Sequence, residues 1–244
     1  MPVSQAGPNL VALNAILMGC FRQSKRRVAL FFTTVLNQPC SPGWVVKLQT
    51  QATAAMKPAY QELLDAVPKQ KVLGADETPT KQGNTKAWMW TFVAQAFTLF
   101  AIRLSRKAEV PLEILGEDFD GILTCDRLKS YWSCGKLQWC WAHLLRDFQA
   151  WIDSPDRVVK RLGHDLMRQT RCLFKLWSKC RDGTLSRAEF ELQMKPVQAA
   201  VHDLLLRGQF RGRPGVSGSC KELYGIAIVC GVSWRPSAWI RRTT

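Results

Sequence analysis

Two aspartates, Asp76 and Asp126, have the residue type and the sequence context of a catalytic pair. Each follows a short apolar run, residues 72–75 and 121–125, that is typical of a buried strand. If these strands are neighbours in one sheet, both carboxylates emerge at the same edge. Carboxylates a few ångströms apart repel each other unless they share a proton or a cation. Their hard oxygen atoms favour Mg²⁺ or Mn²⁺, so Asp76 and Asp126 are predicted metal ligands.

The alternative for both aspartates is structural, because a strand-terminal aspartate is often a turn former or a helix cap. Glu77 adjoins Asp76, but neighbouring side chains of a strand point to opposite faces of the sheet. Asp76 and Glu77 are therefore not expected to share a site, and Asp76 is the residue that we assign to it.

A histidine follows the last predicted strand closely enough to join the same site. Cys140 and His143 form a C-x-x-H step, to which Cys125 and Cys134 would add a zinc set. The spacing fits no standard zinc finger, so the zinc set is disfavoured. His143 is instead expected to contact a phosphate or to orient a site carboxylate. A structural histidine with satisfied hydrogen bonds is the alternative.

The elements that position these residues follow from hydrophobic periodicity. The first 60 or so residues are typical of two or three helices, and a segment at 44–67 is ended by Pro68. Aromatic and β-branched residues then predict a buried hairpin within an α/β fold that has a mixed sheet. The predicted strands are 72–76, 87–94, 97–102, 121–126 and 137–141, with a short helix at 111–115.

Beyond residue 141 the sequence is helical to about residue 206, and the segment 157–181 is amphipathic. Basic side chains occupy one side, with only Asp165 near them, and apolar side chains such as Val158 occupy the other. A basic stripe of this kind can follow a phosphate backbone, whereas a solvated face is the alternative. The predicted DNA-binding residues are Lys160, Arg168, Arg171, Lys175 and Lys179.

Composition and charge narrow the class of protein. The 244 residues are 47% hydrophobic and 22% charged, which excludes a disordered, collagen-like or coiled-coil chain. A net charge of +15 favours an anionic partner, and the acidic residues gather in the middle third between two basic segments.

Targeting and cysteine patterns indicate a soluble cytoplasmic protein with no membrane partner. Basic residues follow the apolar stretch 9–20 instead of preceding it, unlike a secretory signal. The longest apolar segment, 87–102, is interrupted and too short to span a bilayer. The 9 cysteines are scattered without a C-x-x-C pair, so most are expected to be reduced and buried.

Several motifs occur in the order and at the intervals of a known family. They are 74–81 (GADETPTK), 87–92 (AWMWTF), 121–127 (GILTCDR), Tyr131 and 140–148 (CWAHLLRDF). From about Pro8 to Tyr224 the chain resembles the insertion sequence 66 family of bacterial transposases. The resemblance implies a ribonuclease H-like core of the DDE type, in which Asp76 and Asp126 are the first two metal-binding carboxylates. It also implies that the helices after Asp147 form an insertion before the third acid.

The sequence departs from the family beyond Tyr224. The third acid of the family is a glutamate in an Asn-Asn-x-x-Glu-Arg-like motif, which lies beyond a segment similar to 220–224, and no such motif follows here. We therefore expect a frameshift or a premature end of the coding sequence. The cysteine-containing amino-terminal region of the family is also absent.

These observations predict a DNA transposase core that cleaves and joins DNA with Mg²⁺ or Mn²⁺, present as an incomplete and inactive copy that can form a homo-oligomer. One alternative is a non-catalytic DNA-binding fragment that interferes with an intact transposase. Another is a decayed gene whose product does not fold stably. The predicted segments are 1–70 (helical), 71–150 (ribonuclease H-like core), 151–224 (helical insertion) and 225–244 (non-family tail).

Overall fold

The computed structural model describes residues 6–211 and 214–229, and the chain divides into two compact units, Met1–Asp65 and Ala66–Thr244. In the first unit, buried side chains of the second and third helices, among them Val28, Phe32 and Leu48, form an apolar core. Ser24 caps the second helix by accepting a hydrogen bond from the Arg27 N–H. The helices of this unit are α1 (Pro8–Gly19), α2 (Lys25–Thr34) and α3 (Pro42–Ala66).

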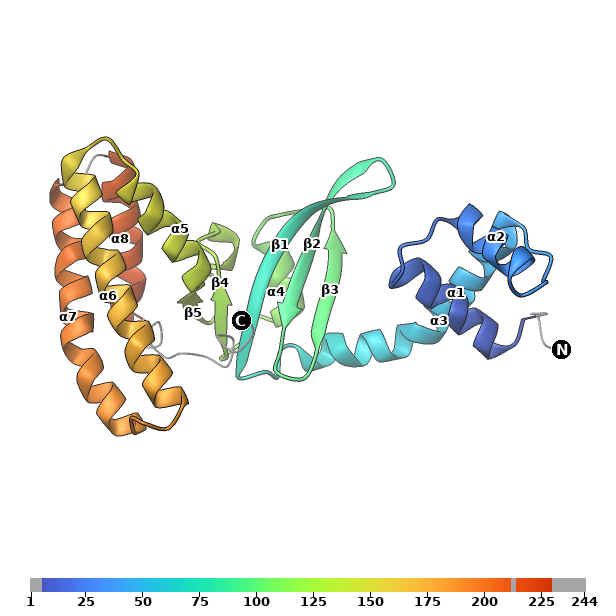
Figure 1. The fold of residues 1–244 in the computed structure, drawn as a ribbon, viewed down its shortest axis with the longest axis horizontal. Coiled ribbons are helices and arrows are strands. Elements are labelled where there is room, and N and C mark those ends of the chain that lie inside the picture. Colours follow the sequence, from blue (N-terminus) through green and yellow to red (C-terminus); the bar gives the residue numbers. More distant parts are fainter. Residues whose placement is uncertain (1–5, 212–213, 230–244) are drawn as a thin grey trace. The chain divides into compact units, whose positions relative to one another are not determined.

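The described part of the second unit is built on a five-stranded mixed sheet with the order β3-β2-β1-β4-β5 (Figure 1). The first three strands pair antiparallel, whereas β4 runs parallel to β1, and β5 parallel to β4. The mixed α/β fold predicted from the sequence is confirmed. The strands are β1 (Val72–Gln82), β2 (Thr85–Val93), β3 (Thr98–Arg103), β4 (Ile122–Cys125) and β5 (Lys136–Trp139).

The first strand is longer than the sequence predicts. Periodicity ended it at Asp76, which was wrong, because β2 pairs with β1 as far as Gln82. Asp76 therefore lies within the strand. Pro79 is tolerated there because β4 pairs with β1 only up to Gly74, so no strand of the described residues adjoins Pro79 on that side.

The later helices of this unit pack against one another, α5 with α6, α6 with α7 and α7 with α8 (Figure 1). Phe190 and Met194 of α7 pack with Leu173 of α6 in a second apolar core. Gly163 lets α6 approach α5 closely, since a Cβ atom there would lie 2.7 Å from the Ile152 nitrogen. The helices are α4 (Glu109–Leu115), a 3₁₀ turn η1 (Lys129–Tyr131), α5 (Trp141–Ile152), α6 (Arg157–Arg181), α7 (Arg187–Arg211) and α8 (Pro214–Val229).

Within the described residues, no helix combines the length and the apolar character that crossing a membrane requires. The four segments predicted from the sequence stay a prediction. Residues 230–244 of the fourth segment lie outside the described residues.

Candidate functional site

One predicted metal ligand lies on β1, and the other directly follows β4, the parallel neighbour of β1. Gly74 of β1 is paired with Thr124 of β4. Asp76 follows Gly74 by two residues within β1, and Asp126 follows Thr124 by two residues, directly after the end of β4. Because parallel strands rise equally per residue, both aspartates lie at the same edge of the sheet. The neighbouring strands that the sequence argument required are therefore present.

The two carboxylates differ in their surroundings. Asp76 is exposed to solvent and Asp126 is partly buried. The Leu128 N–H donates a hydrogen bond of 2.8 Å to Oδ1 of Asp126, so the turn-forming role that the sequence left open is present. This bond orients the carboxylate, and no hydrogen bond within the described residues engages its other oxygen. Asp126 can thus form the turn and still offer an oxygen to a ligand.

His143 is the third residue of α5, which begins directly after β5. The Cys140 N–H donates to the Cys125 carbonyl oxygen at 2.8 Å, which joins the ends of β4 and β5 and brings the start of α5 to the edge that carries Asp126. Nδ1 of His143 is buried without a hydrogen-bond partner in the described part of the chain. This nitrogen therefore does not fit a structural histidine whose hydrogen bonds are all satisfied. The assignment of His143 to the site stays a prediction.

The disfavoured zinc set is not formed. Among the described residues, no group of three or more His, Cys, Asp or Glu side chains could hold a metal ion. Burial raises the pKa of the Cys125 and Cys134 thiols, which opposes the thiolate form that zinc requires. The expectation that most cysteines are buried was wrong, since only Cys125, Cys134 and Cys220 are buried among the described ones.

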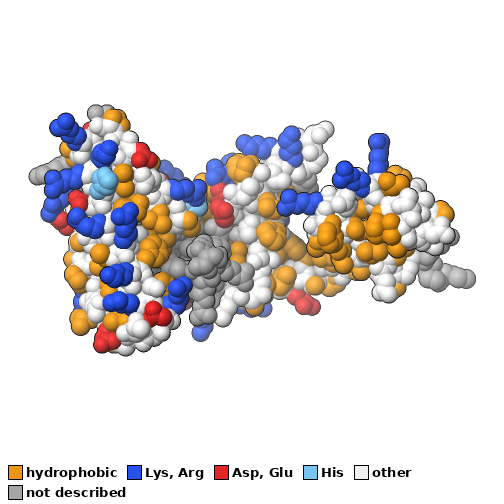
Figure 2. All heavy atoms as spheres, viewed as in Figure 1, with side chains coloured by type: hydrophobic (Ala, Val, Ile, Leu, Met, Phe, Trp, Pro, Cys, Tyr) orange, Lys and Arg blue, Asp and Glu red, His pale blue; other side chains and the backbone are white. Residues whose placement is uncertain are grey.

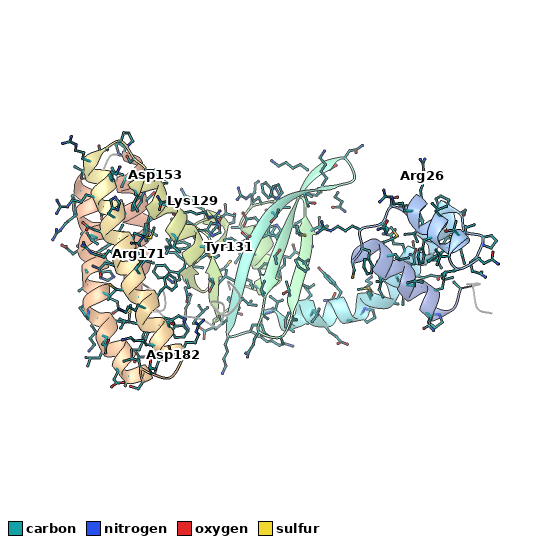
Figure 3. All side chains as sticks on the ribbon, in the orientation of Figure 1. Arg26, Lys129, Tyr131, Asp153, Arg171 and Asp182 are labelled. Atoms are coloured by element: carbon teal, nitrogen blue, oxygen red, sulfur yellow. The ribbon has the colours of Figure 1, made fainter. Side chains whose placement is uncertain are left out.

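Glu77 forms a buried ion pair on the face opposite Asp76. Its side chain is 1% exposed and pairs with Arg106, whose Nε donates to Oε1 at 3.0 Å. The hydroxyl of Tyr131, a residue labelled in Figure 3, donates to Oε2 at 2.7 Å. Burial, and to a smaller extent this hydrogen bond, raises the pKa of Tyr131. The sequence argument separated Glu77 from Asp76 but missed Arg106. Because a glutamate is rarely buried without a partner, its inward position on a strand could have indicated that a basic residue pairs with it.

Arg127 is a further residue that the sequence argument did not single out. It directly follows Asp126 and forms ion pairs with Asp147 of α5 at 2.9 Å and with Glu222 of α8 at 3.7 Å. The loop that carries Asp126 is thereby tied to two helices.

The basic side of α6 faces solvent. Lys160, Arg168, Arg171, Lys175 and Lys179 are all exposed. Arg168 pairs with Asp165 at 2.9 Å, whereas the other four have no ion pair within the described residues. Figure 2 shows basic side chains gathered over this helical part, and Figure 3 labels Arg171 on α6. Val158, which the sequence places on the apolar side, is 59% exposed near the beginning of the helix.

The profile of one known protein family matches most of the chain. The profile of the transposase IS66 family matches residues 4–220, a range that includes Asp76, Asp126, His143 and the whole of α6. No curated protein matches the chain.

Proposed function

Because the chain belongs to the transposase IS66 family, whose function is DNA transposition, we propose that it is a DNA-handling core with a ribonuclease H-like fold and a DDE-type site. The strand order β3-β2-β1-β4-β5, with an antiparallel meander and two parallel strands, supports the fold assignment. The observation that carries the proposal is the register of β1 and β4, in which Gly74 pairs with Thr124, two residues before Asp76 and Asp126 respectively.

The donor set suits Mg²⁺ or Mn²⁺, because both predicted ligands are carboxylates and one of them is exposed. Asp76 and Asp126 would hold the metal, which when bound would polarise the phosphodiester and offset developing negative charge. The Leu128 N–H keeps the Asp126 carboxylate oriented, and Arg127 holds its loop against α5 and α8. His143 would donate a hydrogen bond to a phosphate or to a site carboxylate at the same edge.

The chemistry proposed for the complete family site is hydrolysis of a phosphodiester, followed by attack of the freed 3′ hydroxyl on target DNA. Neither step forms a covalent bond between protein and DNA. The protein contributes by positioning the two phosphodiesters, so loss of a ligand should reduce the rate far more than DNA affinity. The basic face of α6 would hold the DNA backbone.

We further propose that this chain alone lacks a complete site. Its sequence contains no Asn-Asn-x-x-Glu-Arg stretch. No group of three acids that could hold a metal is found among the described residues. The second candidate function, a non-catalytic DNA-binding fragment that competes with an intact transposase, is favoured by the same observation.

Plasmid nicking and DNA binding by the 244-residue chain separate these functions. With Mg²⁺ or Mn²⁺, we expect binding that weakens steeply with salt and no nicked product. Metal-dependent nicking that Asp126→Asn abolishes would instead show a working catalytic site. A chain that does not bind DNA would contradict both functions.

Metal binding is tested separately by thermal unfolding. Mn²⁺ should raise the unfolding temperature of the unchanged chain, because a ligand of the folded state stabilises it. Asp76→Asn should remove that increase, whereas Asp203→Asn, at an exposed position of α7, should keep it. An equal increase in all three proteins would exclude Asp76 as a ligand.

A further inference from the structure

The β1–β2 hairpin continues beyond its neighbours in the sheet. β3 pairs with β2 only from Trp88 onward, and β4 pairs with β1 only up to Gly74. Residues 80–87 therefore form a two-stranded arm, visible in Figure 1 as the loop that extends past β3. Gly83, with a φ of 61°, begins the tight turn at its tip.

The arm starts from the edge that carries the candidate site. β1 runs without interruption from Asp76 to Gln82. At about 3.3 Å per residue, the tip of the arm lies roughly 20 Å from Asp76 along the strand. Side-chain alternation puts Lys81 on the same face of β1 as Glu77, so a ligand at Asp76 would reach the arm's lysines across the side of β1 that β4 leaves unpaired beyond Gly74.

Two lysines face each other on this arm. Lys81 and Lys86 are direct cross-strand partners, and both are exposed. Like charges in this position destabilise a hairpin. Residues 78–87 contain no acid, and neither lysine forms an ion pair within the described part of the chain. The stability of the hairpin therefore does not explain the two lysines.

An aromatic ring and a third cation adjoin the pair. The Lys86 ammonium lies 5.1 Å from the centroid of the Trp88 ring, and the Arg106 guanidinium lies 4.6 Å from it. Arg106 is held by the buried Glu77 yet keeps a side-chain exposure of 43%. Lys86 and Arg106 thus lie against one indole, and Lys81 is the cross-strand partner of Lys86. Basic side chains held in place around a flat ring suit a phosphate backbone.

We propose that this arm binds the sugar–phosphate backbone of duplex DNA beside the candidate cleavage site. The inference rests on the proposed function, because that function places DNA at the edge from which the arm extends. With about 3.4 Å between phosphates along a strand, a reach of roughly 20 Å corresponds to about six base pairs. The arm makes a contact that is independent of sequence and sensitive to salt.

The test measures the anisotropy of a labelled random-sequence duplex over a range of salt with the full chain. Each phosphate contact contributes about 0.9 to the slope of log affinity against log salt. Lys81→Gln combined with Lys86→Gln should therefore lower the magnitude of the slope by about 1.8. Lys57→Gln combined with Lys195→Gln removes the same charge from exposed positions of α3 and α7 and should leave the slope unchanged. An unchanged slope in the arm variant overturns the inference.

A photocrosslinking amino acid placed at Asn84 gives a second measurement that does not depend on affinity. It should crosslink to the duplex, and failure to do so while the chain binds DNA overturns the arm contact. The effect of Asp76→Asn on the Mn²⁺-dependent rise in unfolding temperature is measured separately. If Mn²⁺ stabilises the unchanged chain but not Asp76→Asn, and the lysine variant keeps its salt slope, only the arm contact is refuted. If the slope falls in the lysine variant but Mn²⁺ does not stabilise the unchanged chain, only the proposed metal site is refuted. Absence of any duplex binding refutes both.

Discussion

Asp76 and Glu77 are adjacent residues of β1, but their side chains have different roles. Asp76 points to solvent beside the end of β4, where an incoming ligand can reach it. Glu77 points to the opposite face, where Arg106 and Tyr131 bind both of its oxygens. The alternation of side chains along a strand thus assigns a ligand-accessible role to one acid and a structural role to the other.

The buried ion pair predicts that removing Arg106 destabilises the chain more than neutralising Glu77 does. Arg106→Ala leaves Glu77 buried without its counter-charge and should lower the free energy of unfolding by about 3 kcal/mol. Glu77→Gln should cost only about 1 kcal/mol, because the exposed part of Arg106 can be solvated. Urea unfolding of both variants measures the difference, with Tyr131→Phe, at about 1 kcal/mol, as a reference. Equal costs for Arg106→Ala and Glu77→Gln would contradict this account.

The turn at Asp126 predicts which substitution separates folding from ligand binding. Asp126→Asn keeps an oxygen that can accept from the Leu128 N–H, so its unfolding free energy should match that of the unchanged chain. Asp126→Ala loses this bond and should cost about 1 kcal/mol. Chemical denaturation of the two variants tests the expectation. If the Asn variant is as unstable as the Ala variant, the turn does not depend on this hydrogen bond.

At the scale of elements, α6, α7 and α8 meet closely at Gly208. A Cβ atom there would lie 2.8 Å from Cδ2 of Leu162, and Sγ of Cys220 is also in the way. Gly208→Ala should therefore destabilise the chain by about 2 kcal/mol despite the higher helix propensity of alanine. The matched control is Gly218→Ala on α8, where nothing lies within 4 Å and a small gain is expected. Thermal unfolding distinguishes them, and a stabilising Gly208→Ala would show that the helices can separate there.

If the basic face of α6 contacts DNA, two of its arginines should contribute differently to the salt dependence of binding. Arg168 is already paired with Asp165, whereas Arg171 has no ion pair within the described residues. Arg171→Gln should reduce the salt slope of DNA binding by about 0.9. Arg168→Gln should reduce it less, because Asp165 already offsets part of the Arg168 charge. Filter binding at several salt concentrations measures both slopes, and a larger effect at Arg168 would argue against this face as the DNA contact.

At the scale of the whole molecule, thiol reactivity reports on folding of the second unit. Burial raises the pKa of Cys220 to about 11 and also raises that of Cys125, so both remain protonated near neutral pH. Cys20 and Cys172 are exposed. Because the thiolate is the reactive form, iodoacetamide at mildly alkaline pH should modify Cys20 and Cys172 in the folded chain. Cys125 and Cys220 should react only in denaturant.

Peptide mass spectrometry reads this labelling pattern site by site. Rapid modification of Cys125 and Cys220 without denaturant would mean that the second unit is not stably folded. That result would favour the decayed-gene alternative, which the pattern of exposed and buried thiols otherwise opposes.

Local patterns in the sequence were sufficient to place the five strands approximately and to place Asp76 and Asp126 in or directly after two strands that are neighbours in the sheet. Alternating and helical periodicities depend on residues close together in the chain, so they can be recognised without the fold. The family resemblance, carried by the same motifs, was confirmed by the profile match over residues 4–220.

Only the tertiary structure decided how far β1 extends, which partner stabilises Glu77, and that Arg127 joins the Asp126 loop to α5 and α8. Each of these features depends on residues distant in sequence or on a neighbouring strand. β1 continues to Gln82 because β2 supplies the hydrogen bonds that its own sequence cannot provide. Ion pairs such as Arg106 with Glu77 form when the closed fold brings the two charges together, and no local periodicity records that distance.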